Sequence, residues 1–283
     1  MLKILGVSRS GYNAWRKRKP SKTKQRKERL KTLILNIYEA SRKIFGAPKI
    51  TETLRKAGEK IAQRTVGKYM KEIGLKAIWV KHSTRTTLNS NFSHELKNVL
   101  NRQFNPDKPN SVWVTDITYI WTAEGFVYLN CIMDLFSRRI VAWTLSATLA
   151  VESVLTTLDK AITRNRKGVT EGLLVLHSDR GCQYTSEMWK AATEDFTLSY
   201  SDKGQPYDNA CIESFHALIK REWLNRFNIQ NIEQARILVF DYIETFYNTK
   251  RIHSHCDFQS PNEYEDKYYS ELQKLEAKYG KAV

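Results

Sequence analysis

The spacing of apolar residues changes at residue 111, and this change constrains the fold more than any other feature of the chain. Upstream of it, apolar residues recur at helical spacing. From Ser111–Trp121 onward they alternate with polar residues, and two similar runs follow at Phe126–Leu135 and Arg139–Ala147. Alternation of this length predicts half-buried β-strands. The chain is therefore expected to join a helical N-terminal part to a part built on a sheet.

Helices and strands alternate after these three strands. The expected elements are a helix at Val151–Arg164, a strand that ends at Asp179, a helix at about 184–195, a strand at Thr197–Ser201 and a long helix at about 209–226. The resulting order, β-β-β-α-β-α-β-α, is that of a ribonuclease H-like domain. We therefore expect the α/β class, with a mixed-sheet catalytic core over residues 109–227. C-terminal helices at about 231–249 and 261–279 would make up a region over 228–283.

Residues 26–80 are expected to form a separate domain of three helices. Pro48 is placed to open the second helix, and Gly58 and Gly74 are placed to end the second and third. A basic unit of this size suggests a helix-turn-helix-like domain, whose last helix can enter the major groove of DNA. The outward cations of that helix would be Arg64, Lys68 and Lys71. The alternative is an ordinary helical hairpin with a hydrated basic face.

Positive charge is concentrated in the N-terminal part. The chain has a formal net charge of +16. Residues 1–105 hold 26 Lys/Arg and 6 Asp/Glu, a balance of +20, whereas residues 106–283 hold 20 and 24, a balance of −4. A basic arm of this kind usually binds a polyanion, because neutralised phosphates release condensed counterions. A membrane surface is the rival polyanion, but no run of about 18 apolar residues is present to span a bilayer.

Two segments are expected to have little tertiary structure. Residues 1–25 would be a short basic segment, in which Ser8 caps a small helix that carries Tyr12 and Trp15 on one face. The basic run that follows this helix, Arg16 to Lys31, is either a solvated linker or a segment that contacts DNA. The polar stretch 81–108 is expected to be a second linker, which ends at the turn-forming residues 105–109. The four cysteines form no C-x-x-C pair, which indicates reduced thiols and a cytoplasmic protein.

Three acidic residues are the strongest candidates for a functional site. Asp116 lies within the first strand, Asp179 ends a strand at the sheet edge where ligand sites gather, and Glu213 lies near the start of the long helix. Phosphodiester cleavage can use two divalent ions roughly 3.5–4 Å apart, and Mg²⁺ prefers carboxylate and water oxygens. Three acids on adjacent elements meet that requirement. Taken singly, each could instead be a surface residue or a helix cap.

The long helix is expected to present Glu213 at the edge of the sheet. His216, Ala217 and Lys220 share its face at spacings of three, four and seven residues. An apolar stripe on the opposite side would pack on the sheet: Ile212, Phe215 and Ile219. Lys220 would then be available to contact DNA. Three other acids are weaker candidates: Asp134 is expected to be structural, Asp208 is expected to cap the long helix, and Asp202 has no assigned role.

Several sequence blocks resemble those of a known family. His177–Tyr184 reads H-S-D-R-G-C-Q-Y, and Lys203–Phe215 reads K-G-Q-P-Y-D-N-A-C-I-E-S-F. Both blocks, together with Asp116–Tyr119 and Met133–Arg138, are similar to motifs of the frameshifting, two-frame DDE transposases of bacterial insertion sequences (the IS-three family). The start of the chain resembles the start of that family's second reading frame. The 33 residues between the last two acids (180–212) are slightly fewer than is usual in the family.

The resemblance implies a function and a set of partners. Asp116, Asp179 and Glu213 would be the DDE acids and would bind two Mg²⁺ ions, with Mn²⁺ as a substitute, in a core similar to retroviral integrase. Water would cleave a strand, and the freed 3′-hydroxyl would attack another strand directly. DNA ends and target DNA would be the substrates, and a first-frame product could be a partner. The protein would act in the bacterial cytoplasm near the nucleoid, as a homo-oligomer on DNA.

Two other functions are compatible with the same three acids. A ribonuclease H-like nuclease would hydrolyse DNA without joining strands. A non-catalytic DNA-binding accessory protein could retain the same acids.

Overall fold

The computed structural model of the chain describes residues 4, 6–78, 96–165 and 174–280. The chain divides into two compact units, Met1–Ile78 and Trp79–Val283.

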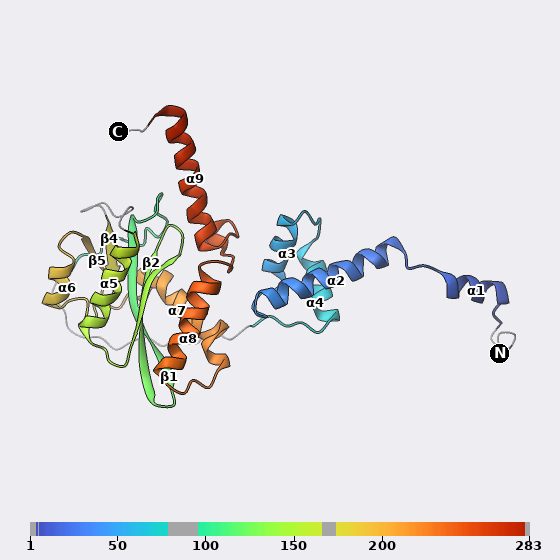
Figure 1. Ribbon diagram of the computed structural model, residues 1–283, viewed down its shortest axis with the longest axis horizontal. Helices are drawn as coiled ribbons and strands as arrows, with labels where there is room; N and C mark the ends of the chain where they lie inside the picture. Colours follow the sequence, from blue (N-terminus) through green and yellow to red (C-terminus); the bar gives the residue numbers. More distant parts are fainter. Residues whose placement is uncertain (1–3, 5, 79–95, 166–173, 281–283) are drawn as a thin grey trace. The chain divides into compact units, whose positions relative to one another are not determined.

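The described part of the first unit is helical (Figure 1). Its elements are α1 (Arg9–Lys17), α2 (Lys22–Ala40), α3 (Ala47–Lys56) and α4 (Gln63–Glu72). Ser8 caps α1 as predicted, since its hydroxyl accepts from the N–H of Gly11 at 3.0 Å. Ser21 caps α2 in the same way. The basic run from Lys22 is therefore helical, and its interpretation as a solvated linker was wrong there.

Helices α2, α3 and α4 share one apolar core, which confirms the three predicted helices. Its buried residues include Leu30, Ile34, Tyr38, Ile50, Leu54, Val66 and Met70. Pro48 lies in the first turn of α3, and Gly58 and Gly74 follow α3 and α4 with φ of 87° and 74°. Gly67 lies where α4 approaches α3, and a Cβ added there would lie 3.8 Å from the Cβ of Ala47. This is an ordinary contact distance, so neither the space nor the backbone requires a glycine in the middle of this helix.

The second unit is built on a five-stranded mixed sheet in the order β3-β2-β1-β4-β5. Its strands are β1 (Val112–Thr122), β2 (Gly125–Asp134), β3 (Ile140–Ser146), β4 (Val175–Ser178) and β5 (Thr197–Tyr200). β1, β2 and β3 form an antiparallel meander, whereas β4 and β5 run parallel to β1. The predicted class, the mixed sheet and the element order are confirmed.

Helices cover both faces of this sheet (Figure 1). They are α5 (Val151–Asn165), α6 (Glu187–Ala192), α7 (Ala210–Glu222) and α8 (Ile232–Tyr242). The last helix, α9 (Pro261–Tyr279), extends beyond the sheet. Trp113 of β1 lies in the core cluster that includes residues of α5 and α6. α7 and α8 pack against β1 as well. Because neighbouring residues of a strand point to opposite faces, Trp113 and Thr115 face one layer of helices, and Asp116 faces α7.

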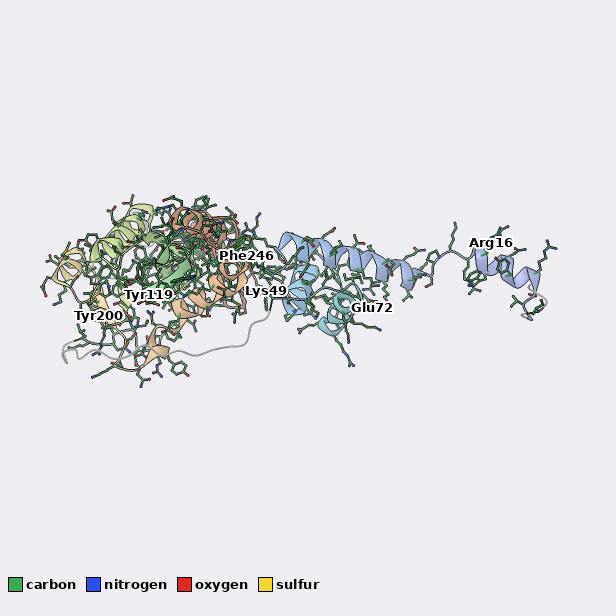
Figure 2. The ribbon with its side chains drawn as sticks, turned by 90° about the horizontal axis from the view of Figure 1, so that it is seen from below. Arg16, Lys49, Glu72, Tyr119, Tyr200 and Phe246 are labelled. Carbon is green, nitrogen blue, oxygen red and sulfur yellow. The ribbon has the colours of Figure 1, made fainter. Side chains whose placement is uncertain are left out.

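Aromatic side chains contribute to the core of the second unit, among them the buried Tyr200 and Phe246 that are labelled in Figure 2. α6 begins only at Glu187, three residues later than predicted, because the chain before it is used in a turn. In that turn Tyr184 is buried, and its hydroxyl lies 3.2 Å from the hydroxyl of Thr115 and 3.2 Å from Oδ1 of Asn130. The short helix is therefore a consequence of a tyrosine that is anchored to the sheet.

The C-terminal helices lie close to their predicted bounds. α8 continues into a π-helical turn, η3 (Ile243–Tyr247), and α9 begins with Pro261 after a capping box formed by Ser260 and Glu263. Between them lies a short 3₁₀ turn, η4 (Ser254–Cys256). Another 3₁₀ turn, η2 (Leu224–Arg226), follows α7, so the long helix ends earlier than expected.

Residues 96–108 of the expected linker contact the sheet domain. Leu96 packs against the core cluster, Leu100 is buried, and the carbonyl of Lys97 accepts from the N–H of Tyr200 on β5. The rest of that stretch, residues 81–95, lies outside the described residues. No helix in the described part of the chain is both long enough and apolar enough to cross a membrane.

Candidate active site

Parallel pairing of β1 with β4 places Asp116 and Asp179 at neighbouring positions. Val114 is the register partner of His177. Two residues further along each chain, the same register leads to Asp116 and to Asp179, which directly follows β4. Paired positions of adjacent strands point to the same face of a sheet. The two carboxylates therefore lie side by side at the carboxyl end of β4.

The charges of these two aspartates influence each other. The pKa of Asp179 is raised to about 6, first by loss of hydration and second by the negative charge of Asp116. The N–H of Gly181, which donates to Oδ1 of Asp179 at 2.9 Å, acts in the opposite direction. A raised pKa means that the negative form is destabilised, so the site favours any cation that can approach.

Glu213 of α7 belongs to the same electrostatic group. Its pKa is raised to about 7, chiefly by loss of hydration and then by the charges of Asp116 and Asp179. Part of its side chain remains in contact with solvent, so the loss of hydration is incomplete. We call Asp116, Asp179 and Glu213 the carboxylate site. The structure brings together all three acids that the sequence singles out.

Asp116 is held by contacts on both of its carboxylate oxygens. Oδ1 accepts from the N–H of Ile117 at 2.8 Å, and Oδ2 lies 3.2 Å from Nδ1 of His216 on α7. Its register partner on β2 is Cys131, a fully buried thiol that offers no charge. Burial, reinforced by the charge of Asp116, raises the pKa of Cys131 well above its ordinary value. This thiol therefore remains protonated.

The start of α7 is tied to the strand that carries Asp116. Nδ2 of Asn209, the residue before α7, donates to the carbonyl of Thr115 at 3.1 Å. The predicted apolar stripe is fully buried beneath the helix: Ile212, Phe215 and Ile219. Each such side chain contributes about 1.5–3 kcal/mol by burial. The helix therefore has both a polar anchor and an apolar seat on the sheet.

Asp208 does not cap α7, and that prediction was wrong. It lies in a 3₁₀ turn, η1 (Pro206–Asn209), where its buried carboxylate forms an ion pair with Nε of Arg102 at 2.7 Å. It also accepts from the N–H of Asp202 at 2.8 Å. Asp208 therefore closes the loop before α7 onto a distant segment. Asp134 is structural as predicted, since it accepts from the N–H groups of Phe136 and Ser137.

A close turn follows Asp179. A Cβ added to Gly181 would lie 3.0 Å from Oδ1 of Asp179 and 3.3 Å from Oε1 of Gln183, so a larger residue would force one of these side chains to move by a few tenths of an ångström. Arg180 does not neutralise the aspartates, because its guanidinium donates to the carbonyls of Ser201 and Leu96. The turn therefore places the Asp179 carboxylate without supplying a cation.

The carboxylate site suits a divalent cation by its chemistry. It offers hard oxygen donors whose charges repel one another, and an ion would remove that repulsion. Among the described residues, however, no three His, Cys, Asp or Glu side chains are grouped closely enough to hold one ion together. The acids are neighbours but do not form a finished ligand set. Cation binding would therefore have to draw their oxygens closer.

The predicted DNA-contacting cations fall into two groups. Arg64, Lys68 and Lys71 are exposed on α4 of the first unit, as expected for an outward face. Lys220 is half-buried on α7 of the second unit. Burial lowers the pKa of Lys220, and the charge of Asp116 opposes this effect. Lys220 therefore lies within the electrostatic reach of the carboxylate site.

Sequence reasoning missed two residues of this site. His216 was placed on the face of Glu213 but received no role, and Asn209 was not singled out. The spacing of three residues between Glu213 and His216 was the available signal, because it puts both side chains on one helical face. Nothing in the sequence indicates that Asn209 reaches Thr115.

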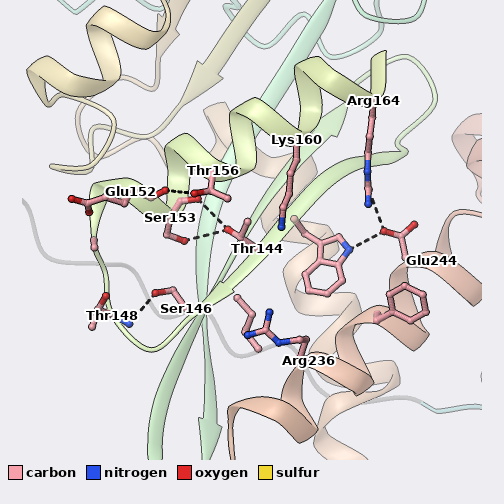
Figure 3. A pocket seen from close by; sticks show the side chains of 14 residues that line it. Thr144, Ser146, Thr148, Glu152, Ser153, Thr156, Lys160, Arg164, Arg236 and Glu244 are labelled. Carbon is pink, nitrogen blue, oxygen red and sulfur yellow. Dashed lines mark hydrogen bonds and ion pairs between the residues drawn. The ribbon is translucent and has the colours of Figure 1, made fainter. Parts of the chain in front are cut away.

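A groove in the second unit is a different feature from the carboxylate site (Figure 3). It has a volume of about 450 Å³ and lies between edge strand β3, α5 and α8. Trp143, Lys160, Arg236 and Glu244 are among its lining residues, and none of the three acids is. The carboxylate site is instead an open surface at the carboxyl end of β4.

The sequence matches the residue patterns of known domain families over most of its length. Residues 106–206 and 194–261 match the integrase core domain, and residues 25–83 match a helix-turn-helix-like domain. The transposase of insertion sequence element IS904 from Lactococcus lactis is 36% identical over 89% of this chain and 99% of its own length. The chain belongs to this family of insertion-sequence transposases.

Other members of the family match over similar lengths. The transposase InsF of IS3A from Escherichia coli is 34% identical over 94% of this chain and 93% of its own length. An uncharacterized protein of insertion element IS600 from Shigella sonnei is 35% identical over 95% of this chain and 98% of its own length. Among solved structures, the catalytic core domain of HTLV-2 integrase in complex with magnesium gives a TM-score of 0.43 at 14% identity, over 56% of this chain and 98% of that chain.

Proposed function

We propose that this transposase cuts the ends of its insertion sequence and joins them to target DNA at the carboxylate site. The observation that supports this most directly is the convergence of three repelling acids, Asp116, Asp179 and Glu213, in a chain of this family. Bound there, two Mg²⁺ or Mn²⁺ ions would stabilise the charge that develops on the attacking and leaving oxygens.

Asp116 on β1 and Asp179 after β4 would bind the metal ions that neutralise the reacting phosphate. The fixed carboxylate of Asp116, held by Ile117 and His216, gives this side of the site a defined orientation. Glu213 closes the site from α7. In cleavage, the oxygen of water bonds to phosphorus and the phosphorus–O3′ bond breaks. Water gives up one proton, and the leaving 3′ oxygen takes up one proton and becomes a hydroxyl.

In strand transfer, the freed 3′-hydroxyl takes the place of water. Its oxygen bonds to a phosphorus of the target, and the target's own 3′ oxygen leaves with the proton. Lys220 interacts electrostatically with Asp116, so its ammonium group could bind a DNA phosphate at the carboxylate site. In the first unit, the cations of α4 would bind the backbone or a groove of DNA. Two DNA ends must be brought together, so we propose that the protein works as a homo-oligomer on DNA, with a first-frame product as a possible partner.

The test is a pair of assays on duplex oligonucleotides that carry the terminal sequences flanking this reading frame. One duplex is intact, and the other carries a pre-cleaved 3′-hydroxyl end. We expect cleavage of the first and joining of the second in Mg²⁺ or Mn²⁺, and loss of both in Asp116→Asn, Asp179→Asn and Glu213→Gln. Hydrolysis without joining would favour a nuclease, and wild-type levels in Asp116→Asn would remove the carboxylate site from the reaction.

A further inference from the structure

His216 makes an unusual contact for a buried histidine. It is only 5% exposed, and its Nδ1 lies 3.2 Å from Oδ2 of Asp116. In the described part of the chain its Nε2 is buried and has no hydrogen-bond partner. Buried polar atoms are nearly always satisfied by hydrogen bonds, so the unpaired Nε2 is an exception. Among the described residues, the polar contact of this ring is the one that Nδ1 makes with Asp116. Nδ1 therefore faces the carboxylate site.

The chemistry of the contact decides which nitrogen of His216 carries hydrogen. An ionised carboxylate only accepts hydrogen bonds, so Nδ1 must offer an N–H to Asp116. In the neutral ring, Nε2 is then a bare acceptor, and leaving it unpaired avoids burying an unpaired N–H. The reverse tautomer would set a lone pair against the carboxylate and bury an orphaned N–H as well. The Nδ1–H tautomer is therefore favoured by both ends of the ring.

His216 is also the only side chain among the described residues that contacts Asp116 through a polar group. The Ile117 N–H restrains Oδ1, and among the described residues only His216 restrains Oδ2. Each oxygen retains a second lone pair for a cation. Polar partners of this kind orient a metal-binding carboxylate and leave its binding capacity intact.

The same contact fixes α7 at a second point. Asn209 joins the start of the helix to the carbonyl of Thr115, and His216 joins the helix to the next residue of that strand, two turns later. Glu213 lies between these two anchors. The distance between Glu213 and Asp116 is therefore set by a helix that is attached to β1 on either side of Glu213.

We propose that His216 is a positioning residue, which orients Asp116 and fixes Glu213 beside it so that the carboxylate site can take up divalent cations. This inference rests on the proposed function, since it concerns how the same acids bind their ions. His216 itself would touch neither the ions nor the DNA.

The experiment compares His216→Phe, His216→Asn and wild-type full-length protein by thermal unfolding during titration with MgCl₂ and with MnCl₂. Phenylalanine keeps a ring of similar size but has no N–H. Asparagine places an amide N–H close to the position of Nδ1. A ligand that binds the folded form raises its melting temperature, so the titration gives a half-saturating cation concentration without any turnover.

We expect His216→Phe to raise that concentration about 10- to 100-fold, the range typical of lost outer partners of metal ligands, and His216→Asn to restore most of it. Ser214→Ala, an exposed change on the same helix, should match wild type. Equal titrations for wild type and His216→Phe would overturn the inference. If His216→Phe does not fold, ¹⁵N NMR of the wild-type histidine rings decides, since an Nε2–H tautomer at His216 would also overturn it.

Asp116→Asn separates this inference from the proposed function. If Asp116→Asn weakens cation uptake and His216→Phe does not, only the role of His216 is lost. If Asp116→Asn also titrates like wild type, the cation site itself is in the wrong place.

Discussion

Glu222 and Arg251 form a two-pronged buried ion pair that joins the end of α7 to the chain after η3. Nε and Nη2 of Arg251 donate to the two carboxylate oxygens of Glu222 at 2.8 and 2.7 Å. The hydroxyl of Tyr242 donates to the same carboxylate at 2.6 Å. Both members of the pair are less than 10% exposed. The C-terminal helices are thereby fastened to the helix that carries Glu213.

Arg251→Ala should destabilise the second unit by about 3–5 kcal/mol, because it leaves the buried Glu222 carboxylate without its cation. Urea unfolding followed by tryptophan fluorescence would measure the loss. Lys190→Ala is the matched control, since Lys190 and Glu187 form an exposed pair at 2.8 Å that should contribute less than about 1 kcal/mol. Similar losses in the two variants would contradict the structural role of the buried pair.

Much of the second unit could be predicted because its signals are local. The alternation of β1 and the helical spacing of α9 are visible within single segments, and the bounds of α9 agree with prediction. The two aspartates could be placed at one sheet edge because strand order and parallel pairing follow from the order of the elements.

The parts that could not be predicted depend on contacts between distant segments. Asp208 looked like a helix cap, but its partner Arg102 is 106 residues away, and no pattern near Asp208 indicates it. α6 is short because the hydroxyl of Tyr184 reaches Thr115 on β1. The His216 contact likewise needs the angle at which α7 crosses the strand, which depends on side-chain packing and cannot be read from spacing.

Stability without divalent cations should fall as pH rises, and Glu213 should cause part of the fall. Its folded pKa of about 7 lies above its ordinary value of 4.5, so the folded form binds more protons between these values. The contribution is fully present below about pH 4.5 and is lost as pH rises through about 7. In EDTA, the melting temperature of Glu213→Gln should therefore rise relative to that of wild type as the pH is raised from 5 to 8. A constant difference between the two proteins would contradict the raised pKa.

Gly181→Ala should reduce cleavage while leaving the fold intact. The added Cβ would press on Oδ1 of Asp179 from 3.0 Å, so the carboxylate must move by a few tenths of an ångström. Errors of about 1 Å at reacting groups can cost about 100-fold in rate, and we expect about a tenfold loss for this smaller one. Single-turnover cleavage at saturating Mg²⁺ would measure it, with thermal unfolding as the check on folding. Full activity would mean that the turn tolerates the side chain.

Gly67→Ala should stabilise the first unit by about 0.5–1 kcal/mol. Glycine in a helix interior carries an entropic disadvantage of that size, and here the new Cβ meets Ala47 at 3.8 Å, an ordinary contact distance. The change in the unfolding transition of residues 1–78 would measure the effect. A destabilised variant would show that α3 and α4 approach more closely than this structure indicates.

Replacing Arg64, Lys68 and Lys71 together with alanine should weaken DNA binding and reduce its dependence on salt. All three side chains are exposed on α4. If each neutralises one phosphate, the slope of log affinity against log salt should become shallower by about 0.9 for each residue lost. Fluorescence anisotropy with a labelled duplex at several NaCl concentrations gives the slope. Lys43→Ala is the control, because Lys43 is an exposed cation of the same unit that lies 3.8 Å from Glu39. An unchanged slope in the triple variant, at any affinity, would mean that α4 does not contact the DNA backbone.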